Sequence, residues 1–224
     1  MGRVHDLVEA HGKQAALNFD VHRNVVEAAA SYLSDEDASK AFIFSGWTQA
    51  ALPHRRLADD EVWQVVSERV TLLVEPGKKP GHPPVSVGVP YGSRARLIML
   101  YLQTEALRTG SRDVELGRSL RVWLGRMGIS IGGKSVRDVR DQAERISRCR
   151  LTFHLTTEGS RGLVNQNIVE AAIFPEDGGA DQGCMFTEKA TLSESFFRQL
   201  QKHPVPLEEA AIRAIALKTP LILR

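Results

Sequence analysis

Residues 93–107 form the stretch that most limits how this chain can fold. Apolar side chains occur at Ala95, Leu97, Ile98, Leu100, Tyr101, Leu102, Ala106 and Leu107. A helix over this stretch has little polar surface, so other elements must cover it on most sides. A chain of 224 residues with 42% hydrophobic content is long enough to build such a core.

Two further helices and a hairpin are predicted after this helix. Residues 116–127 repeat apolar side chains at helical spacing and stop at Gly128, and a short Gly-rich turn at 129–133 follows. A third helix of about 15 residues then has Val136, Val139, Ala143 and Ile146 on one face. Alternating residues 150–156, a turn at 158–162 and a return to Phe174 predict a β-hairpin. This order is typical of a winged helix-turn-helix, in which the last helix lies in the DNA major groove and the hairpin is the wing.

We therefore expect an α+β fold in three segments. Residues 1–84 are an N-terminal extension of helix and short strands, ending in a Pro/Gly-rich loop at 76–84 that cannot sustain a helix or an inner strand. Residues 85–174 are the winged-helix DNA-binding domain. Residues 175–224 are a C-terminal strand and helices, the expected start of a second, truncated module.

The positive charge is concentrated in the middle of the chain. The formal net charge is only +2, but residues 90–162 hold 14 Lys+Arg against 7 Asp+Glu, while both flanking regions are negative. Such a local excess favours a phosphate backbone as the partner. The alternative is a set of solvated arginines paired with local acids, which leaves the local net of +7 unexplained.

The face of the third helix opposite its apolar residues is the first candidate DNA-binding surface. A helical wheel places Lys134, Arg137, Asp138, Asp141, Arg145 and Arg148 there. Arg137 and Arg145 are the candidates for base edges, because Arg reading guanine is the commonest specific contact. Lys134 and Ser135, at the N-terminus of the helix, suit a phosphate. The spacing of Arg137, Asp141 and Arg145 also fits a surface ion-pair ladder.

Further DNA contacts are predicted outside this helix. The basic candidates are Arg94, Arg118, Arg121 and Arg161, the last near the tip of the hairpin. Asn165, with Gln166 and Asn167, either contacts DNA from the wing or belongs to a strand edge.

Residues 128–135 match the P-loop pattern G-x-x-x-x-G-K-[ST], which raises an ATPase as an alternative. A P-loop follows a buried strand and needs an acidic partner for magnesium. Here a helix is predicted before the motif, and neither an apolar run ending in Asp nor a repeated β-α pattern follows it. The glycines more simply permit a sharp turn between two helices.

No catalytic, metal or cofactor site is expected. Origin-nicking enzymes need a His-x-His metal pair, and no two of the seven histidines are two residues apart. Cys149 and Cys184 are not at zinc-binding spacing. The sequence has no apolar run long enough to span a membrane, so we expect a cytoplasmic protein without membrane contact.

Several long stretches resemble a known family. They are LPHRRL (52–57), VTLLVEPG (70–77), VGVPYGSRARLIMLYLQTEALRT (87–109), VELGRSLRVWLGRMGISIGGKS (114–135), QAERISRCRLTF (142–153) and VNQNIV (164–169). They are similar to the plasmid-encoded RepA-type replication initiators of bacteria.

The resemblance implies binding to repeated sites in the plasmid's own double-stranded origin DNA, homodimer formation and recruitment of host replication proteins, without covalent chemistry. Members of the family usually continue past a segment like 207–217 into a further helical DNA-binding portion, whereas this chain stops at Arg224. A transcriptional or copy-number regulator with the same fold is the alternative function.

Overall fold

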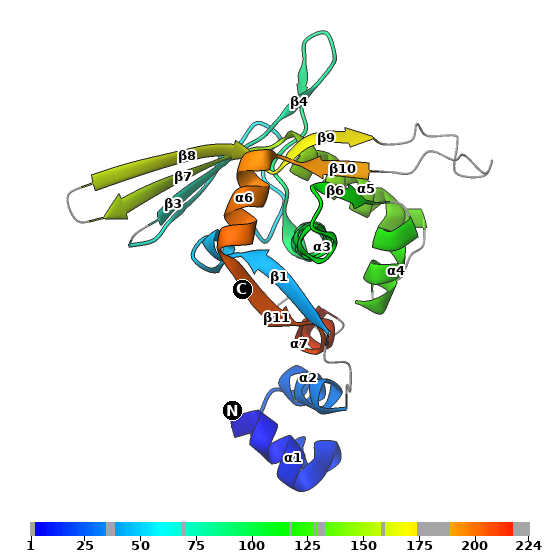
Figure 1. Cartoon of the computed structure of the whole chain (residues 1–224). Helices are drawn as coiled ribbons and strands as arrows, with labels where there is room; N and C mark the ends of the chain where they lie inside the picture. Colours follow the sequence, from blue (N-terminus) through cyan, green and yellow to red (C-terminus); the bar gives the residue numbers. More distant parts are fainter. Residues whose placement is uncertain are drawn as a thin grey trace.

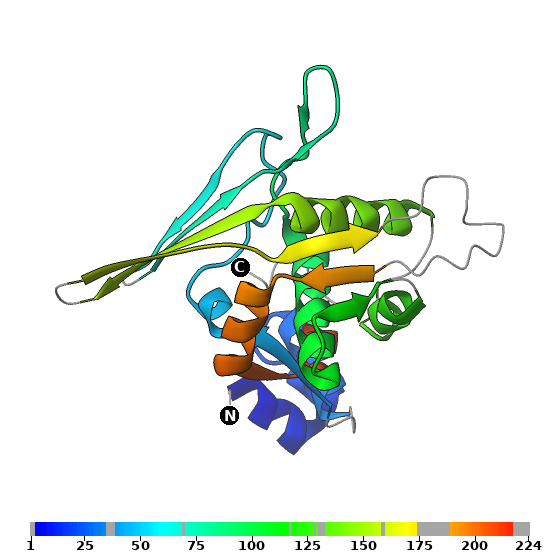
Figure 2. The ribbon, with the colours of Figure 1, turned by 45° about the horizontal axis from the view of Figure 1, so that its top comes forward.

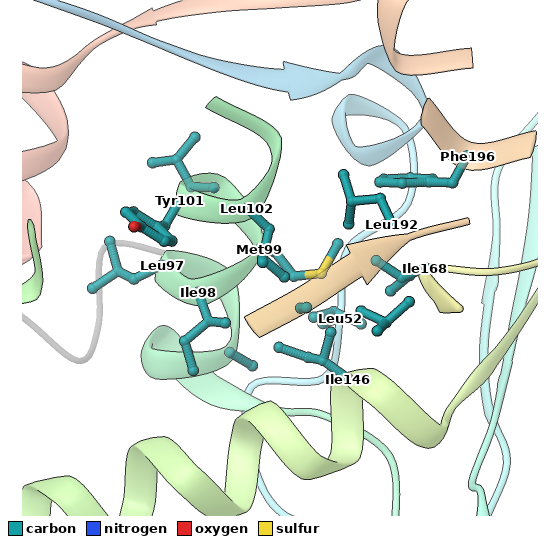
Figure 3. Close-up of a cluster of buried hydrophobic side chains, with 14 of the residues drawn as sticks. Leu52, Leu97, Ile98, Met99, Tyr101, Leu102, Ile146, Ile168, Leu192 and Phe196 are labelled. Carbon is teal, nitrogen blue, oxygen red and sulfur yellow. The ribbon is translucent and has the colours of Figure 1, made fainter. Parts of the chain in front are cut away.

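Helix α3 (Gly92–Thr109) runs through the middle of the molecule (Figure 1). Ten of its residues are buried. Figure 3 shows Leu97, Ile98, Met99, Tyr101 and Leu102 among residues of other elements, namely Leu52, Ile146, Ile168, Leu192 and Phe196. The helix ends at Gly110, whose φ of 65° lies in the left-handed region that glycine adopts most readily. The prediction that this helix is covered on most sides is confirmed.

The computed structural model describes residues 3–34, 39–68, 70–116, 118–127, 129, 133–157, 160–173 and 189–216. The other elements are α1 (Arg3–Ala16), α2 (Arg23–Leu33), β1 (Lys40–Phe44), a 3-10 turn (Ser45–Thr48), β2 (Trp63–Val66), β3 (Val70–Glu75), β4 (Lys78–Lys79), β5 (Val85–Ser86), β6 (Asp113–Glu115), α4 (Arg118–Arg126), α5 (Gly133–Arg148), β7 (Arg150–Thr157), β8 (Ser160–Asn167), β9 (Val169–Ile173), β10 (Lys189–Leu192), α6 (Glu194–Lys202), β11 (Pro204–Glu208) and α7 (Glu209–Ala216).

The strands form four small antiparallel sheets, so the fold is mixed α+β. Their orders are β2-β3-β7-β8, β6-β10-β9, β1-β11 and β4-β5. Strand β3 pairs with β7, and β1 pairs with β11, so pairing crosses both boundaries expected from the sequence. The division of the chain into three domains stays a prediction.

Two buried polar side chains of α3 bind the edge of β1 that β11 leaves free. The Phe44 N–H donates to Gln103 Oε1 at 2.7 Å, and the Phe42 N–H donates to Thr104 Oγ1 at 2.9 Å. Gln103 in turn donates to the Met99 carbonyl. These bonds satisfy backbone groups that would otherwise be buried without partners, which explains why a nearly apolar helix contains Gln103 and Thr104.

The hairpin predicted after the third helix is present, but its expected role as a wing beside that helix is not confirmed. Strands β7 and β8 pair from Arg150↔Asn167 to Thr157↔Ser160. The other edge of β7 pairs with β3, whose residues Leu72 and Val74 are fully buried. Strand β6 pairs with β10, which pairs with β9. The sheet that contains β6 therefore uses β9 and β10, and the hairpin β7–β8 belongs to a different sheet.

The N-terminal helices form a separate hydrophobic cluster. Val8, Ala16 and Val26 are its buried residues. Helix α2 contacts α7, and the Tyr32 hydroxyl donates to Glu208. Among the described helices, none combines the length and the apolar composition that crossing a membrane requires.

Cys149 follows α5 directly and is fully buried. Burial raises the pKa of its thiol to about 12. Because the thiolate is the reactive form, we expect Cys149 not to react with Ellman's reagent at pH 8 while the protein is folded. In a Cys184→Ser variant, one thiol per chain should appear only after unfolding in urea. Rapid labelling of the native protein would contradict this packing.

Candidate nucleic-acid interface

Helix α5 packs through the apolar face that the sequence predicts. Ala143 and Ile146 are buried, and Val139 packs against the core from a partly buried position. These residues face α3 and β9, the elements that α5 contacts most. Lys134 and Arg137 lie away from this face and are exposed.

The charged residues of α5 differ widely in exposure. Lys134, Arg137 and Arg148 are exposed, as the wheel predicts, while Asp138 and Asp141 are partly buried. Ser135, expected at a phosphate, is only 9% exposed. The segment before α5 that matches the P-loop pattern follows α4, a helix, where a P-loop would follow a strand.

Arginines already engage the acids of α5. Asp138 lies 3.5 Å from Arg94, Asp141 lies 2.9 Å from Arg145, and Glu144 lies 3.1 Å from Arg148. In the described part of the chain, Lys134 and Arg137 have no carboxylate within ion-pair distance. The predicted ladder from Arg137 through Asp141 therefore forms only in its second half, and Arg137 is left unneutralised.

The described basic residues of the whole middle segment (90–162) also divide into those with a bound partner and those without one. Seven of its arginines bind a carboxylate or a backbone carbonyl: Arg94, Arg96, Arg108, Arg112, Arg145, Arg148 and Arg150. Arg140 also has an interaction partner. Among the basic side chains of this segment that the structure describes, Arg118, Lys134 and Arg137 have neither a carboxylate nor a carbonyl partner.

Arg145, a predicted base contact, is not at the surface where the wheel places it. Its side chain is buried, with 4% of the residue exposed. The guanidinium lies 2.9 Å from Asp141, 3.6 Å from Asp59 and 5.3 Å from the centre of the Tyr91 ring. We call these four residues the Arg145 cluster. A wheel of one helix cannot reveal this burial, because Asp59 and Tyr91 come from loops far away in the sequence.

The backbone at Gly88 packs closely against the Arg145 side chain. A Cβ atom on Gly88 would lie 2.1 Å from Arg145 Nη1. Gln142, the neighbour of Asp141, accepts a hydrogen bond from the Tyr91 N–H at 2.9 Å and donates to Asp141. The cluster therefore joins α5 to the start of α3.

The loop that contains the stretch LPHRRL supports this joint. The Leu52 carbonyl accepts a hydrogen bond of 2.6 Å from Arg96, whose pKa burial lowers. Arg56 binds Asp59, and this hydrogen bond, together with the charge of Arg145, holds the pKa of Asp59 below its ordinary value. Sequence analysis missed Asp59 and Tyr91, because neither lies on a periodic face.

A polar hollow of about 240 Å³ lies at the start of α3, beside the Arg145 cluster. His54, Arg94 and Arg96 contribute basic groups, and Asp138 and Asp141 contribute acids. Arg94 is thus at the edge of the α5 face, with a carboxylate already bound.

The other predicted contacts have mixed outcomes. Arg118 is exposed at the start of α4. Asn165 is exposed on β8 and accepts a hydrogen bond from Thr152, whereas Gln166 is 5% exposed and faces inward. The side chains of Arg121 and Arg161 lie outside the described residues. Residues 165–167 lie on β8, the edge strand of the four-stranded sheet, where Asn167 pairs with Arg150.

The Arg145 cluster predicts a difference in stability between two arginines of one helix. Replacing Arg145 by Ala removes a buried side chain and two ion pairs, and Asp59 and Asp141 can still turn to water. We expect a loss of about 2 kcal/mol in the free energy of unfolding. Arg137→Ala should change it by less than about 0.5 kcal/mol. Urea unfolding followed by circular dichroism measures both, and equal effects would contradict the burial of Arg145.

Comparison with known proteins identifies the family. Residues 89–223, from just before α3 past α7, match the family described as plasmid encoded RepA protein. No curated protein matches the sequence. Two crystal structures of domains 2 and 3 of RctB are among the solved structures that resemble this chain. The selenomethionine derivative has a TM-score of 0.44, 13% identity and coverage of 70% of this chain and 62% of that chain.

The second, RctB residues 155–483, has a TM-score of 0.39, 14% identity and coverage of 68% and 57%. This chain thus spans less than two thirds of either structure. The family match covers more than half of the 224 residues and confirms the resemblance seen in the sequence. The chain belongs to the family of plasmid-encoded RepA proteins.

Proposed function

We propose that this chain binds the double-stranded origin DNA of its plasmid through α5, without covalent chemistry, as a step in starting replication. The observation that carries the proposal is the solvent face of α5. Lys134 and Arg137 are exposed there without a carboxylate partner among the described residues, while the acids of the helix are bound by other arginines. Membership of the RepA family supports plasmid replication as the process.

The size and place of α5 suit the major groove. The helix has 16 residues, a length of about 24 Å, and the major groove admits one helix. It follows α4 after a short connection, as a recognition helix follows the first helix of a helix-turn-helix. Arg137 is our candidate for a guanine contact, and Lys134 and Arg118 are candidates for phosphates.

The winged-helix interpretation is kept with a different wing. The order α3, β6, α4, α5, β9, β10 and the sheet order β6-β10-β9 support this interpretation, because a winged helix would have both if the hairpin β7–β8 were inserted after α5. In this interpretation β9 and β10 flank the wing, and residues 174–188 between them lie outside the described residues.

The partners follow from the same proposal. Origin sites arranged with two-fold symmetry would call for a homodimer, and initiation needs host replication proteins. A regulator that binds the same DNA without recruiting host proteins is the competing function. Pull-down of host replication proteins on origin DNA separates the two.

Removing Lys134 and Arg137, the cations of α5 without a carboxylate partner among the described residues, should abolish preference for origin DNA. In fluorescence-anisotropy titrations, Lys134→Ala/Arg137→Ala should bind the origin duplex about 10- to 100-fold more weakly than the unaltered chain, because one base contact and one phosphate contact are lost. Binding to a shuffled duplex should fall less, so the ratio of the two affinities should approach one.

A matched control distinguishes the loss of the α5 site from the loss of any two positive charges. Lys13→Ala/Lys202→Ala also removes two exposed positive charges, from α1 and α6, and neither lysine has a carboxylate partner among the described residues. This control should keep the origin preference. The proposal fails if both double variants weaken binding equally, or if the unaltered chain binds the two duplexes alike.

A further inference from the structure

A small hairpin projects from the body beside the C-terminal end of α5. Strands β4 and β5 pair through Lys78↔Ser86 and Lys79↔Val85. Figure 2 shows the hairpin standing out from the body where α5 ends and β7 begins, and Figure 1 shows the same projection from another side. Residues 78–80 and 82–85 are exposed, whereas residues 87–90 at its base are buried. The tip of the hairpin is therefore exposed to solvent, and its base is packed in the protein.

The hairpin is positively charged and contains no acid. Lys78 and Lys79 are exposed and have no carboxylate partner in the described part of the chain. The sequence from Pro76 to Ser93 has no Asp or Glu. The nearest acid before it, Glu75, already faces Arg150 at 4.0 Å. Both lysines can therefore bind an external anion without first breaking an ion pair.

The base of the hairpin is joined to the last turn of α5. The Arg148 guanidinium donates to the Lys78 carbonyl at 3.1 Å. Gly77 lies so close to α5 that a Cβ atom there would be 2.2 Å from the Arg148 carbonyl oxygen. Pro80, Pro83 and Pro84 restrict the backbone further. The hairpin is thus held in one place relative to α5 before any partner binds, which lowers the entropy lost on binding.

The position of the hairpin along α5 indicates which part of the DNA Lys78 and Lys79 would contact. Arg137 and Arg148 are separated by eleven residues, or about 16 Å along the helix axis. The major groove is about 12 Å wide, so a group beyond the end of a helix that crosses it at an angle meets the sugar-phosphate backbone. Lysine is a compact charge that suits single phosphates and does not read bases as arginine does.

We propose that the hairpin β4–β5 is a second DNA-binding element, whose Lys78 and Lys79 bind backbone phosphates at the edge of the groove that α5 occupies. This inference rests on the proposed function, because it takes α5 as the helix in the groove. The hairpin adds affinity and extends the footprint at one end, and sequence preference remains with α5.

Two variants test the hairpin from different directions. Lys78→Ala/Lys79→Ala removes its charge. Gly77→Ala leaves every charge in place and forces the hairpin away from the Arg148 backbone. We compare both with Lys13→Ala/Lys202→Ala and with Lys134→Ala/Arg137→Ala, using anisotropy on origin and shuffled duplexes over a salt series and hydroxyl-radical footprinting. Thermal unfolding confirms that each variant is folded under the binding conditions.

The lysine variant should bind origin DNA roughly tenfold or more weakly, and the slope of log K against log salt should fall by about two, one for each phosphate lost. It should keep the ratio of origin to shuffled affinity, and its footprint should be shorter at one end. Gly77→Ala should reproduce the shorter footprint.

Hairpin variants that match the Lys13/Lys202 control in affinity, slope and footprint would overturn the inference while leaving the role of α5 intact. If the unaltered chain showed no origin preference but the lysine variant still lowered the salt slope, the proposed function would fail and the hairpin contact would stand. If the unaltered chain did not bind DNA, both would fail.

Discussion

The molecule is organised by the need to cover α3. Its ten buried residues require neighbours all around the helix, and these come from distant parts of the sequence: β1, α4, α5 and α6 all contact it. Gln103 and Thr104 show how closely this cover is fitted, since they bind backbone N–H groups of β1 within the core. Because α5 packs on α3 through Ala143 and Ile146, the same requirement also decides which face of α5 reaches solvent.

The basic side chains of the middle segment fall into two groups, and the buried Arg145 belongs to the first. One group supports the structure: Arg145 binds Asp141 and Asp59, Arg96 binds the Leu52 carbonyl, and Arg94 binds Asp138. The other group is small and exposed, and includes Lys134 and Arg137 on α5. A net charge of +7 over the middle segment indicates a nucleic-acid partner. It does not indicate which residues are available, because that depends on which acids already have partners.

Periodicity predicted the parts of the fold that depend on local sequence. It identified the buried helix, the two helices after it and the hairpin β7–β8. It failed for Arg145, since the residues that cover this side chain, Asp59 and Tyr91, lie on loops far away in the sequence. It also gave no sign that β7 pairs with β3, because this pairing joins strands about 80 residues apart, and no local pattern encodes it. The stretch 76–84 has the composition of a linker, and only its contact with Arg148 reveals a fixed hairpin.

Amide NMR of the isotope-labelled chain, titrated with its origin duplex, would test most directly whether α5 is the DNA-binding helix. Bound DNA should shift the amides of residues 133–138, while those of α6, β1 and β11 on other sides of α3 should stay in place. A shuffled duplex should produce smaller shifts at α5 under the same conditions. Shifts concentrated on α6 or β1, with α5 unchanged, would contradict the account, as would identical spectra with both duplexes.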